Sequence, residues 1–203
     1  MQRSRSVGFM ASAWVFPGGR VDPGDDLPLS LPEHEGAVPA AFWVAAAREL
    51  EEEAGVQLGD PGGASVSRLR PWSHWITPEV EPRRYDTWFF TARVPHGQSP
   101  VPDGGEAVDG GWFTAAQALQ RAADGTLPLA PPTLRTLLEL APFGSVSDIL
   151  AAPRRLVPIC PRFLTGEDGL LYVLLPGDPE YPAPEPADPP FRYVFDAGRW
   201  WAR

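Results

Sequence analysis

Residues 48–56 read Arg-Glu-Leu-Glu-Glu-Glu-Ala-Gly-Val, and this stretch decides how the rest of the chain is interpreted. It ends a segment from about Pro39 to Ala54 in which apolar residues recur at helical spacing. Gly55 stands where the C-terminal cap of a helix belongs. The pattern therefore predicts a helix from about Pro39 to Ala54.

Three carboxylates share one face of this predicted helix, because Glu49, Glu52 and Glu53 stand at i, i+3 and i+4. Like charges at this spacing repel by about 0.2–0.5 kcal/mol per pair, and the helix dipole disfavours anions near a C-terminus. A purely structural helix gains nothing from the arrangement, whereas a hard cation coordinated by oxygen turns the repulsion into binding. The alternative is a solvated charge run on a surface helix.

Such carboxylates suit the hydrolysis of a phosphoanhydride. Mg²⁺ takes only one or two carboxylates, so one of the three glutamates is left to orient a water molecule. The attack places negative charge on oxygens, which a cation stabilises, while a base takes a proton from the water. Glu49 and Glu52 are equal candidates for that base. Arg48 can pair with a carboxylate from the preceding loop or touch phosphate.

Together with an upstream Phe16-Pro17-Gly18-Gly19 turn, the segment resembles the box of the nudix hydrolase superfamily: Gly, five residues, Glu, seven residues, Arg-Glu-apolar-x-Glu-Glu-x-Gly-apolar. Its second half matches at every fixed position, at Arg48, Glu49, Leu50, Glu52, Glu53, Gly55 and Val56. The resemblance implies an α/β/α sandwich with a mixed curved sheet. It also implies metal-dependent catalysis in which these glutamates and the Gly19 carbonyl hold Mg²⁺, with Mn²⁺ as an alternative.

The first half of the box departs from the pattern in two ways. Counting from Gly19, Asp25 takes the place of the glutamate whose family role is to brace the arginine. The next gap runs from Asp26 to Ala47, 22 residues where the pattern has seven. Asp25 braces Arg48, or Asp22 does, or the role is lost. Because the insertion, about residues 26–40, is a Pro-rich loop, the helix should be undisturbed.

A box interrupted at this place resembles the subgroup that includes the mammalian peroxisomal coenzyme A diphosphatase. Local stretches share the likeness: residues 8–10, 15–19, 75–78, 83–87, 89–90 and 129–133. The subgroup implies hydrolysis of coenzyme A or acyl-coenzyme A to 3′,5′-ADP and a phosphopantetheine. The rival enzyme is a hydrolase of ADP-ribose, NADH or a nucleotide sugar. The alternative of another class is a non-catalytic nudix-fold module that senses a nucleotide.

Two further positions are candidates for the site. Arg83 and Arg84 can grip a phosphate outside the metal site, with Asp86 bracing one guanidinium, or they are surface arginines at the start of a strand. Glu106 lies where many nudix enzymes place an additional loop carboxylate for metal or water, or it caps an exposed Asp-Gly-Gly turn. Trp72 and Trp75 can stack on an adenine, although aromatic residues of a strand are more often core.

Composition limits the partners and the compartment. The formal net charge of −9 argues against nucleic acid and anionic membranes as partners. The resemblance implies a small nucleotide-type molecule as the substrate. A single cysteine, Cys160, makes no internal disulfide, so we expect a reducing cytoplasm. Neither a signal-length apolar run nor 18 uninterrupted apolar residues occur, so we expect no export and no membrane span.

Other patterns predict a nudix domain over residues 1–153 and a Pro-rich β extension over 154–203. Strands are predicted at 14–16, 66–69, 72–76, 85–94 and 107–113, and helices at 114–123, at 133–140 and after a capping box at 145–148. The extension should hold strands at 156–164, 170–175 and 191–195 around an extended loop at 176–190. It can close over the substrate, complete the sheet or form a homodimer contact.

Overall fold

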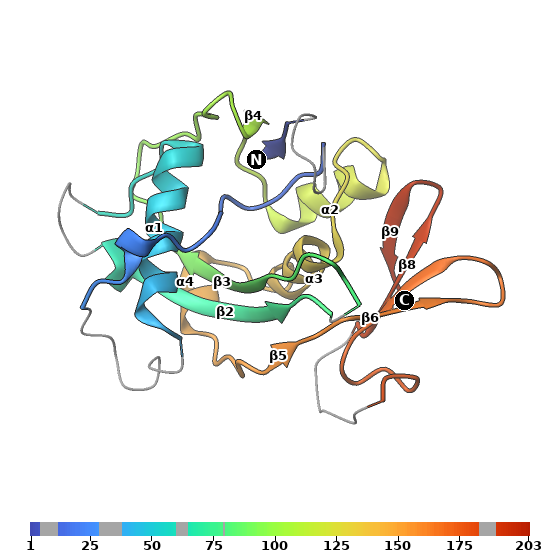
Figure 1. Cartoon of the computed structure of the whole chain (residues 1–203). Helices are drawn as coiled ribbons and strands as arrows, with labels where there is room; N and C mark the ends of the chain where they lie inside the picture. Colours follow the sequence, from blue (N-terminus) through green and yellow to red (C-terminus); the bar gives the residue numbers. More distant parts are fainter. Residues whose placement is uncertain (5–11, 29–37, 60–64, 79, 183–189) are drawn as a thin grey trace. The chain divides into compact units, whose positions relative to one another are not determined.

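A computed structural model describes residues 1–4, 12–28, 38–59, 65–78, 80–182 and 190–203 (Figure 1). The chain divides into two compact units that interleave along the sequence: residues 1–72, 89–113 and 143–154 form unit 1, and residues 73–88, 114–142 and 155–203 form unit 2. Helices and strands occur in both units, so the predicted α/β class is confirmed. The stretch 8–10 and most of the inserted loop lie outside the described residues.

Helix α1 spans Ala40–Ala54 in unit 1, which confirms the central prediction. Gly55 ends it in the left-handed conformation, with φ of 63°, and its amide donates to the Glu51 carbonyl oxygen at 2.8 Å. Trp43 on α1 is fully buried and packs on Phe90, with ring centroids 5.2 Å apart. The helix thereby gains a fixed position within unit 1.

The segment before the Phe-Pro-Gly-Gly turn is not the strand predicted at 14–16. It makes a single antiparallel bridge between Trp14 and Gln2, and Val15 exchanges two backbone hydrogen bonds of 2.8 and 2.9 Å with Met1. Pro17 has no amide hydrogen and cannot extend this pairing. Strand β1, Gln2–Arg3, instead pairs with β4, Ala107–Asp109, in antiparallel orientation. Strand β4 is shorter than predicted because Gly110 and Gly111 follow it.

A three-stranded sheet has the order β3-β2-β5. Strand β2 spans Leu69–Ile76, β3 spans Asp86–Ala92, and Pro158–Ile159, strand β5, pairs with β2 in parallel. The strand predicted at 66–69 is wrong, because Ser65–Arg68 form a 3-10 turn, η3, that Arg70 closes with a 3.0 Å hydrogen bond to the Ser67 carbonyl oxygen. Part of the C-terminal extension therefore completes this sheet.

Three further helices agree with the predictions. Thr114 caps α2, Ala115–Ala123, through reciprocal hydrogen bonds with Gln117. Helix α3, Pro131–Leu140, begins two residues earlier than predicted, since proline is tolerated in a first helical turn. In unit 1, Ser145 caps the short α4, Val146–Ala151, by accepting a hydrogen bond from the Asp148 amide.

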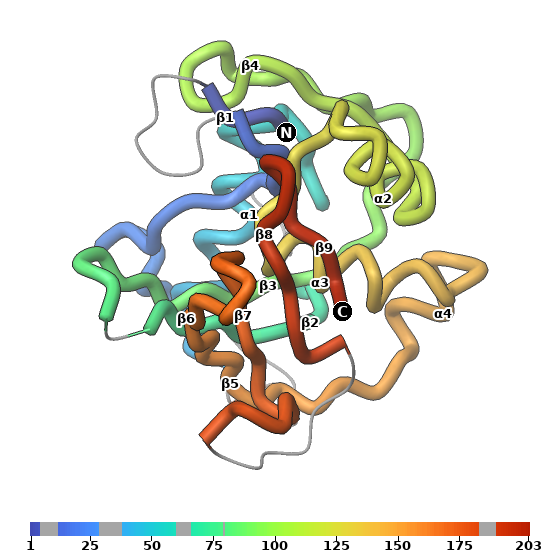
Figure 2. The backbone as a smooth tube through the Cα atoms, turned by 90° about the vertical axis from the view of Figure 1, so that its right-hand side faces the viewer, coloured from blue at the N-terminus to red at the C-terminus, as the bar shows by residue number. Residues whose placement is uncertain are grey.

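The remaining extension forms a four-stranded antiparallel sheet within unit 2, seen in orange and red in Figure 2. Its order is β6-β7-β8-β9, with bounds Arg162–Thr165, Leu171–Leu174, Arg192–Asp196 and Arg199–Ala202. The strand predicted at 156–164 is split into β5 and β6, since Pro161 interrupts the ladder. Strand β9 was not predicted. The domain boundary at 153/154 stays a prediction.

Within the described ranges, no helix is both long and apolar enough to cross a bilayer.

The packing of α1 gives a stability prediction. We expect Trp43→Ala to lower the free energy of unfolding by about 3–5 kcal/mol, because it removes a fully buried indole and leaves a cavity against Phe90. Urea unfolding followed by circular dichroism measures the loss. Val108→Ala, at a side chain that is largely exposed, serves as the control and should change stability by less than about 0.5 kcal/mol. Equal effects of the two changes would contradict the packing described.

Candidate active site

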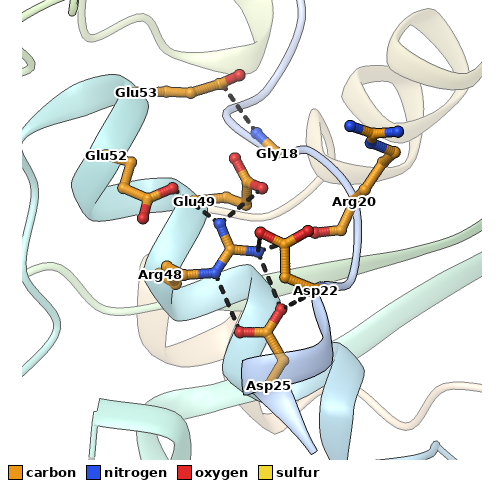
Figure 3. A network of polar contacts seen from close by, with 8 residues as sticks. All are labelled: Gly18, Arg20, Asp22, Asp25, Arg48, Glu49, Glu52 and Glu53. Carbon is orange, nitrogen blue, oxygen red and sulfur yellow. Dashed lines mark hydrogen bonds and ion pairs between the residues drawn. The ribbon is translucent and has the colours of Figure 1, made fainter.

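Arg48 and Asp25 form a bidentate ion pair, in which one guanidinium donates two hydrogen bonds to one carboxylate (Figure 3). Arg48 Nε donates to Asp25 Oδ1 at 3.0 Å and Nη2 donates to Oδ2 at 2.9 Å. Asp25 is only 2% exposed and ends a 3-10 turn, η1, at Pro23–Asp25. Asp22, by contrast, is 3.9 Å from Arg48 Nη2, and its side chain is 62% exposed. Of the two acids that the sequence offered as a brace, the structure pairs Asp25 with Arg48.

The remaining donors of Arg48 bind two carboxylates of the same helix and one backbone carbonyl oxygen of the turn. Nη1 donates to Glu49 Oε1 at 2.9 Å and to Glu52 Oε2 at 2.8 Å, and Nη2 donates to the Arg20 carbonyl oxygen at 2.8 Å. The hydrogen bond from Arg48 lowers the pKa of Asp25 despite its burial, and the bond to Asp25 is the main cause that raises the pKa of Arg48. Both groups therefore stay charged across the ordinary pH range.

The Phe-Pro-Gly-Gly turn meets the last turn of α1 at two carboxylates. The Gly18 amide donates to Glu53 Oε2 at 3.0 Å, as Figure 3 shows. Gly19 lies so close to Glu49 that a Cβ at this position would collide with the carboxylate. A side chain at position 19 would therefore force the carboxylate at the end of the Glu49 side chain to move.

Glu53 is buried among negative charges. Burial raises the pKa of Glu53, the Gly18 hydrogen bond opposes this, and the charges of Glu49 and Glu106 raise it further. Glu106 precedes β4 in a loop that Asp103 organises by accepting hydrogen bonds from the amides of Glu106 and Ala107, at 3.2 and 2.9 Å. The structure thus brings Glu106 within electrostatic reach of Glu53, although the two residues are far apart in the sequence.

The chemistry of this donor set fits a hard divalent cation. Every acidic donor is a carboxylate oxygen, the kind of ligand that such a cation prefers. Burial is the main cause that raises the pKa of Glu53, and the negative charges of Glu49 and Glu106 add to it. In the described part of the chain, no three acidic, histidine or cysteine side chains converge on one point ready to hold a metal. Arg48 accounts for part of this, because it binds Glu49 and Glu52 at once. Arg48 contacts one oxygen of each carboxylate, Glu49 Oε1 and Glu52 Oε2.

Arg83 and Arg84 lie in unit 2, in the exposed loop between β2 and β3. Arg84 Nε donates to the Thr77 carbonyl oxygen at 3.1 Å. Asp86 Oδ1 lies 2.6 Å from His74 Nε2, and a brace between Asp86 and one of these arginines stays a prediction. Of the two adenine-stacking candidates, Trp72 is 1% and Trp75 4% exposed, so both belong to the core.

The structure adds two groups that the motif did not identify. One is the Gly18 amide, which fixes Glu53 and which the conspicuous Gly-Gly pair could have suggested. The other is Arg3, whose positive charge lowers the pKa of Glu53 as the smallest of five influences. No local sequence signal identifies Arg3, because its placement depends on the pairing of β1 with the distant strand β4.

The brace gives a prediction about stability and its pH dependence. We expect Asp25→Asn to lower the free energy of unfolding at pH 7 by about 1.5–3 kcal/mol, since it removes a charged acceptor from a buried pair. The folded-state pKa of Asp25 is lowered, so its contribution is present above about pH 4 and is lost as the pH falls below that value. Urea unfolding between pH 3 and pH 7 measures the difference.

Asp22→Asn is the matched control, because the exposed Asp22 carboxylate is 3.9 Å from the same guanidinium. It should change stability by less than about 0.5 kcal/mol. A larger effect of Asp22→Asn than of Asp25→Asn would reassign the brace to Asp22.

Comparison with known proteins agrees with this geometry. A model of the NUDIX domain family matches residues 39–133. The acyl-coenzyme A diphosphatase NUDT19 of Gallus gallus is 28% identical, with 90% of this chain and 72% of that protein covered. The protein of the same name from Xenopus laevis is 29% identical over 58% of this chain and 33% of its own length.

A solved structure shows the same fold. The crystal structure of a nudix hydrolase from Alicyclobacillus acidocaldarius superposes with a TM-score of 0.62 and 24% identity, over 74% of this chain and 86% of the other. The helix with its arginine and glutamates, the glycine turn and the family match lead to one assignment. Residues 39–133 match the nudix domain family, and the chain is similar to nudix hydrolases.

Proposed function

We propose that this chain is a divalent-cation-dependent diphosphatase that hydrolyses coenzyme A or acyl-coenzyme A to 3′,5′-ADP and a phosphopantetheine. The observation that carries the reaction is the set of glutamates on the last turns of α1, with Glu53 fixed by the Gly18 amide and Arg48 fixed by Asp25. The substrate class is supported by the likeness to the NUDT19 proteins named above. It is a small molecule of the nucleotide type.

The proposed ligands of Mg²⁺, with Mn²⁺ as an alternative, are the carboxylates of Glu49, Glu52 and Glu53, the Gly19 carbonyl and, further out, Glu106. Hard oxygen donors of this kind suit either ion. A bound cation supplies positive charge that stabilises the oxygens on which negative charge develops.

The chain's own residues orient the reacting groups. Glu49 and Glu52 remain equal candidates for the base that takes a proton from the attacking water. Arg48 holds both of them on one side of α1, and Asp25 keeps Arg48 from turning away. Glu53 cannot move freely, because the Gly18 amide holds one of its oxygens. Arg48 therefore acts as a positioning residue in this proposal.

Arg83 and Arg84 remain proposed contacts of an anionic part of the substrate, because both are exposed on the loop between β2 and β3. Homodimer formation through the C-terminal extension and a cytoplasmic location also stay predictions. Hydrolysis of ADP-ribose, NADH or a nucleotide sugar is the rival activity, since the same carboxylates serve any phosphoanhydride. A nucleotide-sensing module is the remaining alternative. A protein that only binds a nucleotide gains nothing, however, from carboxylates that repel one another on one helix face.

The carboxylates give the first functional prediction. We expect Glu52→Gln and Glu53→Gln each to lower kcat by about 10²-fold or more, because each removes a charged oxygen while preserving shape. Steady-state kinetics measures the loss, and circular dichroism checks the fold. Glu51→Gln on the same helix is the control, because Glu51 is exposed and bonds Gln57 instead of Arg48. Near wild-type turnover in both site variants would refute the assignment of the site.

The substrate gives the second prediction. The protein is incubated with Mg²⁺ and, separately, coenzyme A, acyl-coenzyme A, NADH, ADP-ribose and nucleotide sugars, and the products are identified by mass. We expect 3′,5′-ADP from the coenzyme A compounds to form fastest, and removal of the metal with EDTA to stop product formation. Faster release of AMP from NADH or ADP-ribose would favour the rival hydrolase. Thermal stabilisation by nucleotide without any product would favour the sensor.

A further inference from the structure

The segment that leads from β3 to β4 packs against the C-terminal end of α1. The Val101 amide donates to the Ala54 carbonyl oxygen at 2.8 Å. Ala107, at the start of β4, shares one buried apolar cluster with Ala54. Glu53 immediately precedes Ala54, and Glu106 immediately precedes Ala107. Backbone contacts and apolar packing therefore hold the segment that carries Glu106 against the end of the helix that carries Glu53.

The backbone of Glu106 is fixed on both sides. Its amide donates to Asp103 Oδ2 at 3.2 Å, and its carbonyl oxygen accepts from the Ser4 amide at 2.8 Å. Asp103 Oδ1 accepts a second hydrogen bond, from the Ala107 amide at 2.9 Å. The Gly104 amide closes the turn by donating to the Ala107 carbonyl oxygen at 3.0 Å. One carboxylate thus binds two successive amides and orders the peptide units around Glu106.

The side chain of Glu106 is not needed to build this turn. The sequence allowed Glu106 to cap the Asp-Gly-Gly turn, but Asp103, the first residue of that turn, caps it. Glu106 is exposed, and among the residues that the structure describes its carboxylate makes no hydrogen bond or ion pair. The turn therefore presents a carboxylate that is available to a ligand, on a backbone that is already ordered.

We propose that Asp103 is a positioning residue of the cation site, which acts by holding Glu106 where its carboxylate binds the divalent cation directly or through water. A ligand on an ordered loop loses less conformational entropy on binding than one on a loop that must first become ordered. Groups that hold metal ligands in place affect metal affinity for this reason. The inference rests on the proposed function in that Glu106 belongs to the cation site, whichever phosphoanhydride is hydrolysed.

The test measures Mn²⁺ binding without substrate. Mn²⁺ is titrated into the full chain and its variants, and the free ion is followed by electron paramagnetic resonance. We expect Asp103→Ala and Glu106→Gln each to raise the Kd on the order of tenfold, as is typical for residues around a metal. In the double variant the second change should add almost nothing, because both remove the same interaction.

Asp109→Ala is the matched control. Asp109 is an exposed aspartate on β4 that also accepts a hydrogen bond from a backbone amide, that of Gly110 at 2.8 Å. Its replacement removes the same charge from the same strand region without touching the Glu106 turn. It should change the Kd for Mn²⁺ by less than about twofold, because water and salt screen an exposed charge.

Three results would overturn the proposal. If Asp103 only stabilises the fold, Asp103→Ala lowers the melting temperature and leaves the Kd unchanged. If the Kd rises equally with and without the Glu106 carboxylate, Asp103 does not act through Glu106. An unchanged Kd in Glu106→Gln removes Glu106 from the site. If Asp103→Ala does not fold, Asp103→Asn, which cannot accept both amides at its single carbonyl oxygen, decides, and a wild-type Kd in that variant also overturns the proposal.

The two proposals fail in different ways. A chain whose Mn²⁺ affinity depends on Asp103 through Glu106, but which hydrolyses none of the compounds in the panel, would refute the proposed function and leave the role of Asp103 standing. Hydrolysis of coenzyme A together with an unchanged Kd for Mn²⁺ in Asp103→Ala would do the reverse.

Discussion

The pair between Arg48 and Asp25 is the constraint on which the site depends. It joins the end of the glycine turn to the third turn of α1, across an insertion that triples the usual spacing of the box. Because the entropy of closing a loop grows only slowly with its length, the insertion can lengthen at small cost while the two ends stay fixed. Arg48 also keeps a donor nitrogen for Glu49 and Glu52, so one guanidinium positions both the turn and the carboxylates of the helix.

Local patterns predicted the parts of the fold that local interactions determine. Helix α1, with its cap at Gly55, and helix α2, with its capping box, form where the spacing and cap residues indicate. The failures are strands whose existence depends on a distant partner: residues 14–16 make only a bridge, and β9 forms because β8 lies beside it. Asp22 and Asp25 were indistinguishable as braces, since only the three-dimensional turn η1 buries one of them and exposes the other.

Charge balance explains why the carboxylates are tolerated in this fold. Arg48 offsets the charge of Asp25 and touches two more carboxylates, while Glu53 is buried with a backbone amide as its hydrogen-bond donor. The fold thus carries an excess of negative charge at the end of α1, where the helix dipole adds to the repulsion. Within the proposed function, a cation relieves this repulsion, and the positive charge of Arg48 beside the same carboxylates opposes its binding.

Gly19 and Gly24 lie in the same loop but differ in what a substitution would do to their surroundings. Any side chain at position 19 would displace the Glu49 carboxylate, whereas a Cβ at Gly24, five residues later in the same loop, would meet no atom within 4 Å. A substitution at Gly19 therefore moves the Glu49 carboxylate, whereas a substitution at Gly24 displaces no neighbouring atom. A single methyl group at position 19 is enough to shift a carboxylate that Arg48 also holds, so the turn and this face of α1 cannot vary independently.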